Sequence, residues 1–373
     1  MSPLFLFGTL QHRPLMEAVL GVCDHLDIKP AQLAWHSVHA VAEGPFPMIT
    51  ADPMGVVEGR LVAGLTAEDV AKLDYYEAAF DYSLERVTLT DGSVARCYFP
   101  APGVWTPQGA WSLEAWAETA GPMSILAAQD VMTYYGSKTP QEIGAMFPMI
   151  RARAWSRLNA QHSIHGQGTL FGRVDVATRQ RPYASYFALD EYNLRHERFD
   201  GSMTEEVKRA VFLAPDATLV LPYDPIRDRV LLVEQMRMGP LARGDRAIWQ
   251  LEPVAGRLDP GEAPETAARR EALEEAGLHM GDLEPVAQTY CSPGNSTEFY
   301  YIFVGHADLP DAVQGVGGLD AEDEDIKSHL ISFEDLMTLC DRQEVANAPL
   351  VMVAYWLARH RDRLRHAWTS PPS

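Results

Sequence analysis

The sequence has little cysteine, no long hydrophobic run and no basic start. Its four cysteines, Cys23, Cys97, Cys291 and Cys340, are scattered without a CxxC pair, which is typical of buried free thiols in a reducing cytoplasm. No window approaches the roughly 18 apolar residues that a membrane span needs. The opening residues MSPLFLFGTLQHR lack the basic region of a signal peptide and resemble a strand. These absences predict a cytoplasmic protein with no membrane partner.

Basic residues are also scarce. Lysine and arginine total 31 against 51 aspartates and glutamates, which gives a formal net charge of -20. A nucleic-acid polymer needs a basic face, so this balance speaks against DNA or RNA as a partner. A small nucleotide is still possible, because a divalent metal can bridge acidic side chains to phosphate.

The length of 373 residues indicates two or three domains. Residues 1–100 are predicted to form an α+β unit, with a helix capped by Thr66 and Asp69 and a hairpin turned at Asp91 and Gly92. Residues 101–165 begin with a Pro/Gly connector and continue with helical periodicity, so they are interpreted as a helical linker. Strand patterns return in residues 166–373, which are predicted to form the second domain.

The segment GRLDPGEAPETAARREALEEAGL, residues 256–278, carries a concentration of glutamates on one predicted helix. Pro264 suits the first turn of that helix and Gly277 suits the position after its end. Glu271, Glu274 and Glu275 then project from one side, where like charges destabilise a helix unless they face water or a cation. Hard oxygen ligands of this kind suit Mg²⁺, or Mn²⁺, with substrate phosphates completing the shell.

The spacing of this segment closely resembles the Nudix box. In that pattern a glycine, a glutamate, an Arg-Glu pair, a Glu-Glu pair and a final glycine followed by an apolar residue stand at fixed intervals. The matching positions are Gly256, Glu262, Arg270, Glu271, Glu274, Glu275, Gly277 and Leu278. Ala272 departs from the pattern, because a larger aliphatic residue is usual there.

The flanking sequence resembles the ADP-ribose pyrophosphatase branch of the Nudix hydrolases, which includes members labelled tellurite-resistance proteins. The resemblance runs from about residue 185 to residue 365, and Ser292-Pro293-Gly294 matches a marker of this branch. It implies substrate-binding roles for Ser292 and Gly294.

The resemblance also implies which residues bind metal and activate water. The metal ligands would be Glu271, Glu275 and the backbone carbonyl of Ala255, with Glu274 assisting. The acidic segment GLDAEDEDIKSHL resembles the loop whose glutamate activates water, which implies Glu322 in that role and Glu324 as second choice.

Contacts to the rest of the nucleotide follow from the same resemblance. The family implies a homodimer whose N-terminal strands cross over. Tyr186 would stack on adenine, and Arg209 and Arg237 would contact phosphate or sugar groups.

The N-terminal region carries a second resemblance. FLFGTL followed by LDYYEAAFDYSLER is similar to the γ-glutamylcyclotransferase-like (AIG2-like) family over residues 3–100. The sequence departs from the family at Phe7, where tyrosine is common. The resemblance implies that the backbone amides of Gly8, Thr9 and Leu10 hold the substrate.

Glu77 is a candidate general base on independent grounds. Val70, Leu73 and Glu77 share one stripe of the predicted helix, the stripe that should face the core. A partly desolvated carboxyl has a raised pKa, which suits proton transfer. In the family the matching glutamate takes a proton from the substrate's amine, which then cyclises. The alternative is a solvated Glu77, or a domain that keeps the fold without the activity.

These observations together predict an α/β (α+β) protein. Its parts would be a small γ-glutamylcyclotransferase-like β-barrel/α domain, a helical linker and a Nudix α/β/α sandwich with a mixed sheet. The function implied is Mg²⁺-dependent hydrolysis of ADP-ribose to AMP and ribose 5-phosphate. Two alternatives stay open: another nucleoside diphosphate sugar as substrate, or a sensor that binds a nucleotide without cutting it.

Overall fold

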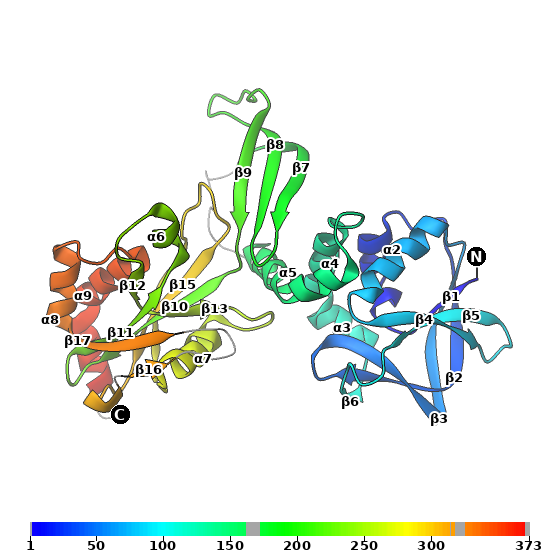
Figure 1. Ribbon diagram of the computed structural model, residues 1–373, viewed down its shortest axis with the longest axis horizontal. Helices are drawn as coiled ribbons and strands as arrows, with labels where there is room; N and C mark the ends of the chain where they lie inside the picture. Colours follow the sequence, from blue (N-terminus) through cyan, green and yellow to red (C-terminus); the bar gives the residue numbers. More distant parts are fainter. Residues whose placement is uncertain (1, 162–171, 314, 318–324, 370–373) are drawn as a thin grey trace. The chain divides into compact units, whose positions relative to one another are not determined.

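The computed structural model describes residues 2–161, 172–313, 315–317 and 325–369. The chain divides into two compact units (Figure 1). The first comprises Met1–Ala188 and Asn193–Val207, and the second comprises Leu189–Tyr192 and Lys208–Ser373. None of the helices in the described residues combines the length and the apolar character that crossing a bilayer requires.

The first unit is built on a six-stranded mixed sheet with the order β4-β5-β1-β3-β2-β6. Its strands are β1 (Leu4–Leu6), β2 (Asp27–Val41), β3 (Gly44–Ala63), β4 (Tyr82–Thr88), β5 (Val94–Pro100) and β6 (Pro107–Ala110). Only the β1–β5 pair is parallel among the pairings described for this sheet. The tight turn between β4 and β5 contains Gly92 at a φ of 83°, as the Asp91-Gly92 pattern predicts.

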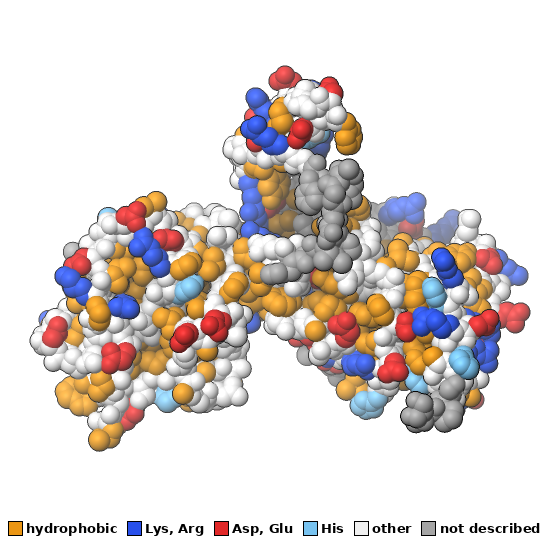
Figure 2. Space-filling model, turned by 180° about the vertical axis from the view of Figure 1, so that it is seen from behind, with side chains coloured by type: hydrophobic (Ala, Val, Ile, Leu, Met, Phe, Trp, Pro, Cys, Tyr) orange, Lys and Arg blue, Asp and Glu red, His pale blue; other side chains and the backbone are white. Residues whose placement is uncertain are grey.

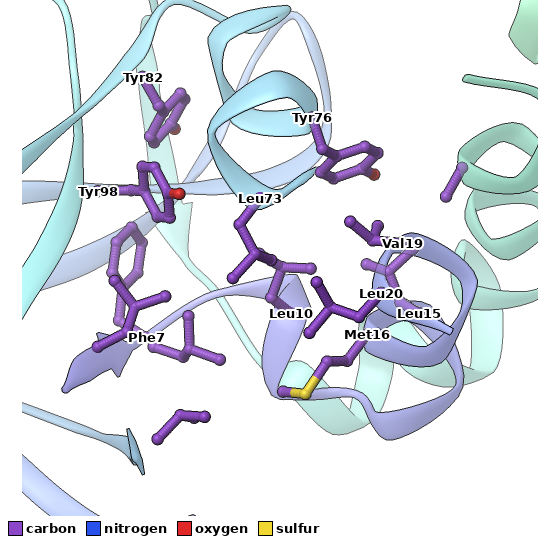
Figure 3. Packing of buried hydrophobic residues seen from close by; sticks show 14 of the residues in the cluster. Phe7, Leu10, Leu15, Met16, Val19, Leu20, Leu73, Tyr76, Tyr82 and Tyr98 are labelled. Atoms are coloured by element: carbon purple, nitrogen blue, oxygen red, sulfur yellow. The ribbon is translucent and has the colours of Figure 1, made fainter. Parts of the chain in front are cut away.

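Helices pack on this sheet and complete one hydrophobic core. They are η1 (Thr9–Gln11), α1 (Arg13–Leu20), α2 (Ala67–Ala78), α3 (Leu113–Thr119), α4 (Gly121–Met132) and α5 (Pro140–Gln161). The Thr66–Asp69 capping box predicted for α2 is present. Figure 3 shows Leu73 and Tyr76 of α2 lying close to Leu15, Val19 and Leu20 of α1.

Helices α3–α5, which the sequence predicts as a linker, are part of the first unit's core instead. Trp116, Val131, Ile143 and Ile150 are 0–5% exposed and belong to the same core cluster as β1 and α2. Residues 113–161 form helices, as their periodicity predicts. Their apolar faces are buried in the core of the first unit, whereas a free linker would expose them to solvent.

A three-stranded sheet follows, with the order β7-β8-β9. Its strands are β7 (Val174–Ala184), β8 (Ala188–His196) and β9 (Val207–Leu213). Every described residue of β7 is at least partly exposed, including Val174 and Val176.

The second unit contains a mixed sheet with the order β14-β15-β10-β11-β17-β16, while β12 pairs with β11 and β13 with β10. The strands are β10 (Ala217–Asp224), β11 (Arg229–Met236), β12 (Trp249–Glu252), β13 (Val254–Arg257), β14 (Leu283–Tyr290), β15 (Phe299–His306), β16 (Val316–Gly317) and β17 (Ile326–Ser332). The helices are α6 (Met238–Arg243), α7 (Pro264–Ala276), η2 (Asp311–Val313), α8 (Phe333–Asp341) and α9 (Ala348–Thr369).

The alternation of side chains along β10 divides this unit into layers. Leu219 and Leu221 belong to a core shared with α8 and α9, whereas Val220 belongs to a core shared with Ala268 and Ala272 of α7. The sheet thus lies between α7 on one face and α8 and α9 on the other (Figure 1). This is the α/β/α sandwich predicted from the sequence.

Candidate functional site

The glutamate-rich segment forms the helix that its sequence predicts. Pro264 occupies the first turn of α7, and Gly277 ends the helix in the left-handed conformation with a φ of 64°. Ala272, the residue that departs from the motif, is fully buried against the sheet. A small side chain here lets the helix lie close to the strands beneath it.

Arg270 hydrogen-bonds to three carboxylates on and just before this helix. Its guanidinium donates to Glu262 at 2.9 Å and 3.1 Å, to Glu271 at 2.7 Å and to Glu274 at 3.0 Å. Burial alone would raise the pKa of Glu262, but hydrogen bonds from Arg270 and the Asp259 amide outweigh burial and hold the pKa below its usual value. These bonds raise the pKa of Arg270, so the guanidinium is always charged.

Two further contacts connect α7 to strand β13. Glu275 is 3% exposed and accepts a hydrogen bond of 3.2 Å from the amide of Ala255. The carboxylate of Glu271 lies directly against Gly256, where an added Cβ would come within 1.9 Å of its oxygen. Only glycine leaves room for that carboxylate at this point. Glu271 and Glu275 therefore both lie against the Ala255–Gly256 segment of β13.

The described residues do not form a complete metal centre by geometry alone. They contain no group of three or more His, Cys, Asp or Glu side chains arranged to hold a metal ion. Arg270 binds Glu271 and Glu274, while Glu275 turns to the Ala255 amide. The chemistry of the donors nevertheless fits a hard divalent cation, because they are carboxylates from one helix and a neighbouring backbone carbonyl.

The first unit contains a cavity beside Glu77, the candidate general base. Phe7, Gly8, Thr9, Leu10 and Glu77 all line it. Its volume of about 80 Å³ provides room for several water molecules. The structure thus brings together the Gly8–Leu10 segment and the carboxyl of Glu77, which the sequence placed in one site.

Glu77 lies in the last turn of α2 and faces this cavity. Glu77 is half-buried, and desolvation, followed by the charge of Asp74, raises the pKa of its carboxyl to about 8. Tyr98 donates a 2.7 Å hydrogen bond to Asp74, and Tyr82 donates one of 2.9 Å to the carbonyl of Pro47. Glu77 thus lines the cavity with a half-buried side chain, beside core residues such as Leu73.

Comparison with known proteins identifies both units. Residues 213–352 match the NUDIX domain family, and residues 4–113 match the family described as Gamma-glutamyl cyclotransferase, AIG2-like. A protein named ADP-ribose pyrophosphatase from Escherichia coli K12 is 39% identical over 200 residues, which cover 53% of this chain and 95% of that protein. The chain belongs to the Nudix hydrolase family.

Further relatives carry one of two names, ADP-ribose pyrophosphatase or GDP-mannose pyrophosphatase. An ADP-ribose pyrophosphatase from Haemophilus influenzae is 32% identical over 52% of this chain and 90% of its own length. A GDP-mannose pyrophosphatase from Enterobacter is 30% identical over 46% of this chain and 88% of its own length. A crystal structure of an ADP compounds hydrolase aligns with a TM-score of 0.40 at 20% identity, covering 50% of this chain and 96% of that one.

The remaining predicted residues lie in several places. Arg237 is bound to Glu252 through both carboxylate oxygens at 2.6–3.1 Å, and Glu252 is 5% exposed. Ser292 begins the turn after β14, where its carbonyl accepts from the amides of Asn295 and Ser296. Gly294 lies in the same turn with no heavy atom within 4 Å of its would-be Cβ.

Two further predicted residues, Arg209 and Tyr186, lie on or beside the three-stranded sheet. Arg209 lies on β9, where its guanidinium donates to the carbonyl of Lys208 at 2.9 Å. Tyr186 belongs to the first compact unit and packs edge-on against Phe187 with ring centroids 4.6 Å apart. The two proposed water-activating residues, Glu322 and Glu324, lie outside the described residues.

Sequence reasoning missed some residues that the structure brings to the two sites. Glu252 is one, since a single glutamate on a short strand carries no motif of its own. Trp116 and Arg151 are the others, because they line the cavity from helices that were interpreted as a linker. The amphipathic pattern of those helices was the signal that could have found them.

The raised pKa of Glu77 predicts a specific pH dependence of stability. Unfolding returns its pKa from about 8 to the ordinary 4.5, so between these values the unfolded state binds fewer protons than the folded state. The free energy of unfolding therefore falls as the pH rises from about 4.5 to 8. Because glutamine cannot ionise, we expect Glu77→Gln to be more stable than wild type at pH 8 by about 2–4 kcal/mol.

This difference can be measured by chemical denaturation of the full chain between pH 5 and pH 8.5. The gap between Glu77→Gln and wild type should narrow as the pH is lowered toward 5. Glu118→Gln, which changes an exposed carboxylate on α3, serves as the control with no such gap. A gap for Glu77→Gln that is constant across the range would contradict the raised pKa.

Proposed function

We propose that this protein hydrolyses the pyrophosphate of ADP-ribose to AMP and ribose 5-phosphate. The arrangement of α7 supports this most strongly, since Arg270 collects three glutamates while Gly256 and Ala255 lie against Glu271 and Glu275. The names of the relatives at 39% and 32% identity support ADP-ribose as the substrate. The GDP-mannose pyrophosphatase at 30% identity makes another nucleoside diphosphate sugar the alternative.

The proposed metal ligands are Glu271, Glu274, Glu275 and the carbonyl of Ala255. When bound, Mg²⁺, or Mn²⁺ in its place, supplies neutralising charge for the pyrophosphate and polarises a water molecule. Arg270 hydrogen-bonds to Glu271 and Glu274, whose side chains are 13% and 31% exposed. The helix therefore keeps its carboxylates oriented before the substrate arrives, which lowers the cost of binding.

The proposed reaction adds one water across the phosphorus–oxygen bridge. Glu322, with Glu324 as second choice, would accept the water's proton as general base. The water oxygen forms the new bond to one phosphorus, and the bridging oxygen leaves with the other. Two monophosphates result, and no oxidant or reductant is needed.

Further contacts are proposed for the nucleotide. The Arg237–Glu252 pair, together with the turn at Ser292 and Gly294, would bind phosphate or sugar groups, because its bonds to the buried Glu252 hold the half-exposed Arg237 guanidinium in one orientation. Arg209 and Tyr186 would contact the nucleotide of a homodimer, as the family resemblance implies. The cytoplasm suits a protein with buried free thiols at Cys23, Cys97 and Cys340.

Substrate preference tests this function. We expect purified protein with Mg²⁺ to cleave ADP-ribose with a kcat/KM at least about tenfold above that for GDP-mannose, a difference of about 1.4 kcal/mol. EDTA should reduce both rates to background. Preference for GDP-mannose would favour the second substrate class. Tight binding of ADP-ribose without any cleavage would favour a nucleotide sensor.

A homodimer is the second expectation from this proposal. The exposed apolar residues Val174 and Val176 on β7, each at least 54% exposed, offer a surface that a second copy would cover. Light scattering of the full chain should give twice the chain mass of 41.4 kDa. The double variant Val174→Asp/Val176→Asp should shift the mass toward the monomer, whereas a wild-type monomer would contradict the proposal.

A separate activity is proposed for the first unit. Glu77 faces the cavity beside Gly8, Thr9 and Leu10, which supports a γ-glutamylcyclotransferase reaction in which this carboxyl accepts the substrate's amine proton. A pKa of about 8 leaves the carboxyl mostly protonated at neutral pH, so this role requires the bound amine to lower the pKa. The alternative is an inactive relative that keeps the cavity for binding only.

A further inference from the structure

The walls of the first unit's cavity come from two parts of the chain. One wall belongs to the segment that matches the AIG2-like family, residues 4–113. The other comes from helices beyond that match. Its residues are Trp116 of α3, Met123, Ser124 and Ala127 of α4, and Phe147 and Arg151 of α5. The helices outside the family segment therefore shape the space that a ligand can occupy.

These helices are fixed in place by the core. Ala128 and Val131 of α4 and Ile143 and Ile150 of α5 are completely buried. Trp116 is 5% exposed and donates a 2.5 Å hydrogen bond to the carbonyl of Pro45. Rigid helices place binding side chains more accurately than loops do, so this wall is suited to selecting a ligand.

Most of the lining is aromatic or aliphatic. Phe46, Phe80 and Phe147 contribute rings, and Phe80 meets Phe147 edge-on with centroids 4.6 Å apart. The polar ends of Tyr82 and Tyr98 bond to Pro47 and Asp74. The cavity thus favours a ligand with an apolar body.

The charged lining is limited to one residue of each sign among the described residues. Glu77 is the carboxyl and Arg151 is the cation. A guanidinium in the lining of an apolar cavity attracts a carboxylate strongly, because the low dielectric weakens the competition from water and the planar fork matches two oxygens. A lysine would supply charge without that match.

We propose that Arg151 anchors the carboxylate of a small ligand whose apolar body lies against Trp116 and Phe147. The fixed helices α3–α5 make Arg151 a specificity-determining residue that the AIG2-like segment lacks. This inference concerns binding and holds whether or not the first unit catalyses a reaction.

The test uses three probes of nearly equal size on the full chain. They are 3-phenylpropionate, its neutral amide, and 3-phenylpropylamine, each titrated by calorimetry at pH 7. We expect the carboxylate to bind at least about tenfold more tightly than the amide and the amine. Arg151→Met should abolish this preference while leaving amide binding within a few-fold. Arg151→Lys should keep part of it.

Two controls locate the effect. Arg13→Met removes a cation that is 60% exposed on α1 and does not line the cavity, so it should keep the full preference. Ser124→Phe fills the cavity from α4 and should abolish binding of all three probes. Equal binding of carboxylate and amide by wild type, or a preference that survives Arg151→Met, would overturn the proposal. If Arg151→Met fails to fold, the affinities of the wild-type chain for the carboxylate and the amide still test the proposal.

Discussion

Glu275→Gln is expected to lower the kcat for ADP-ribose at least about 100-fold, a loss of about 2.7 kcal/mol of transition-state stabilisation. Glutamine keeps the size of the side chain and can still meet the Ala255 amide, which lies 3.2 Å from Glu275. It removes the negative charge that the proposed metal site needs at a position only 3% exposed. The effect should therefore fall on catalysis and leave the fold intact.

Initial rates over a range of Mg²⁺ concentrations, with thermal unfolding of the same samples, measure this effect. Glu265→Gln is the matched control, because Glu265 lies exposed in the first turn of the same helix. That variant should keep wild-type activity. Near-wild-type turnover by Glu275→Gln in saturating Mg²⁺ would refute the metal assignment for α7.

Asp130→Asn is expected to destabilise the first unit by about 3–5 kcal/mol. Asp130 is 6% exposed on α4 and accepts hydrogen bonds from Arg153 of α5 at 3.1 Å and from Arg181 of β7. Arg181 also bonds to the hydroxyl of Tyr134 at 2.8 Å. Asparagine keeps the shape but leaves two buried guanidiniums without the carboxylate that offsets their charge.

Differential scanning calorimetry should detect this change as a fall in the melting temperature. A unit of about 200 residues loses roughly 2–4 °C per kcal/mol, so the fall should be about 6–20 °C. Asp24→Asn removes a carboxylate that is 78% exposed and paired with Arg13, and should change the melting temperature little. A small effect of Asp130→Asn would show that the buried cluster contributes no net stability.

Charged side chains of both signs are visible on the surface of the protein (Figure 2). Figure 2 shows acidic and basic side chains interspersed over the visible described faces. On the face shown, charged side chains of both signs are mixed rather than gathered in one patch. This distribution helps solubility and does not alone determine which small ligands bind.

The glutamate-rich helix was predictable because its determinants are local. Pro264 and Gly277 set its ends, and the three-to-four spacing sets the face of its carboxylates. The contact between Glu271 and Gly256, in contrast, is seen only in the structure. Strand patterns in residues 166–373 likewise predicted that this part of the chain forms strands such as β10.

The cavity wall was not predictable because its determinants are not local. The periodicity of residues 113–161 indicates helices but cannot show which core they join. Their apolar faces pack against β1 and α2, far away in sequence, and this packing brings Arg151 to the cavity of Glu77. The hydrogen bonds from Arg270 to Glu262, Glu271 and Glu274 similarly required coordinates, since rotamers decide them.

Analysis of the products that the purified full chain forms from ADP-ribose with Mg²⁺ tests the proposed hydrolysis most directly. We expect AMP and ribose 5-phosphate in equal amounts, with Glu77→Gln within a few-fold of wild type and Glu275→Gln nearly inactive. Intact ADP-ribose after prolonged incubation with wild type, or products other than these two monophosphates, would contradict it.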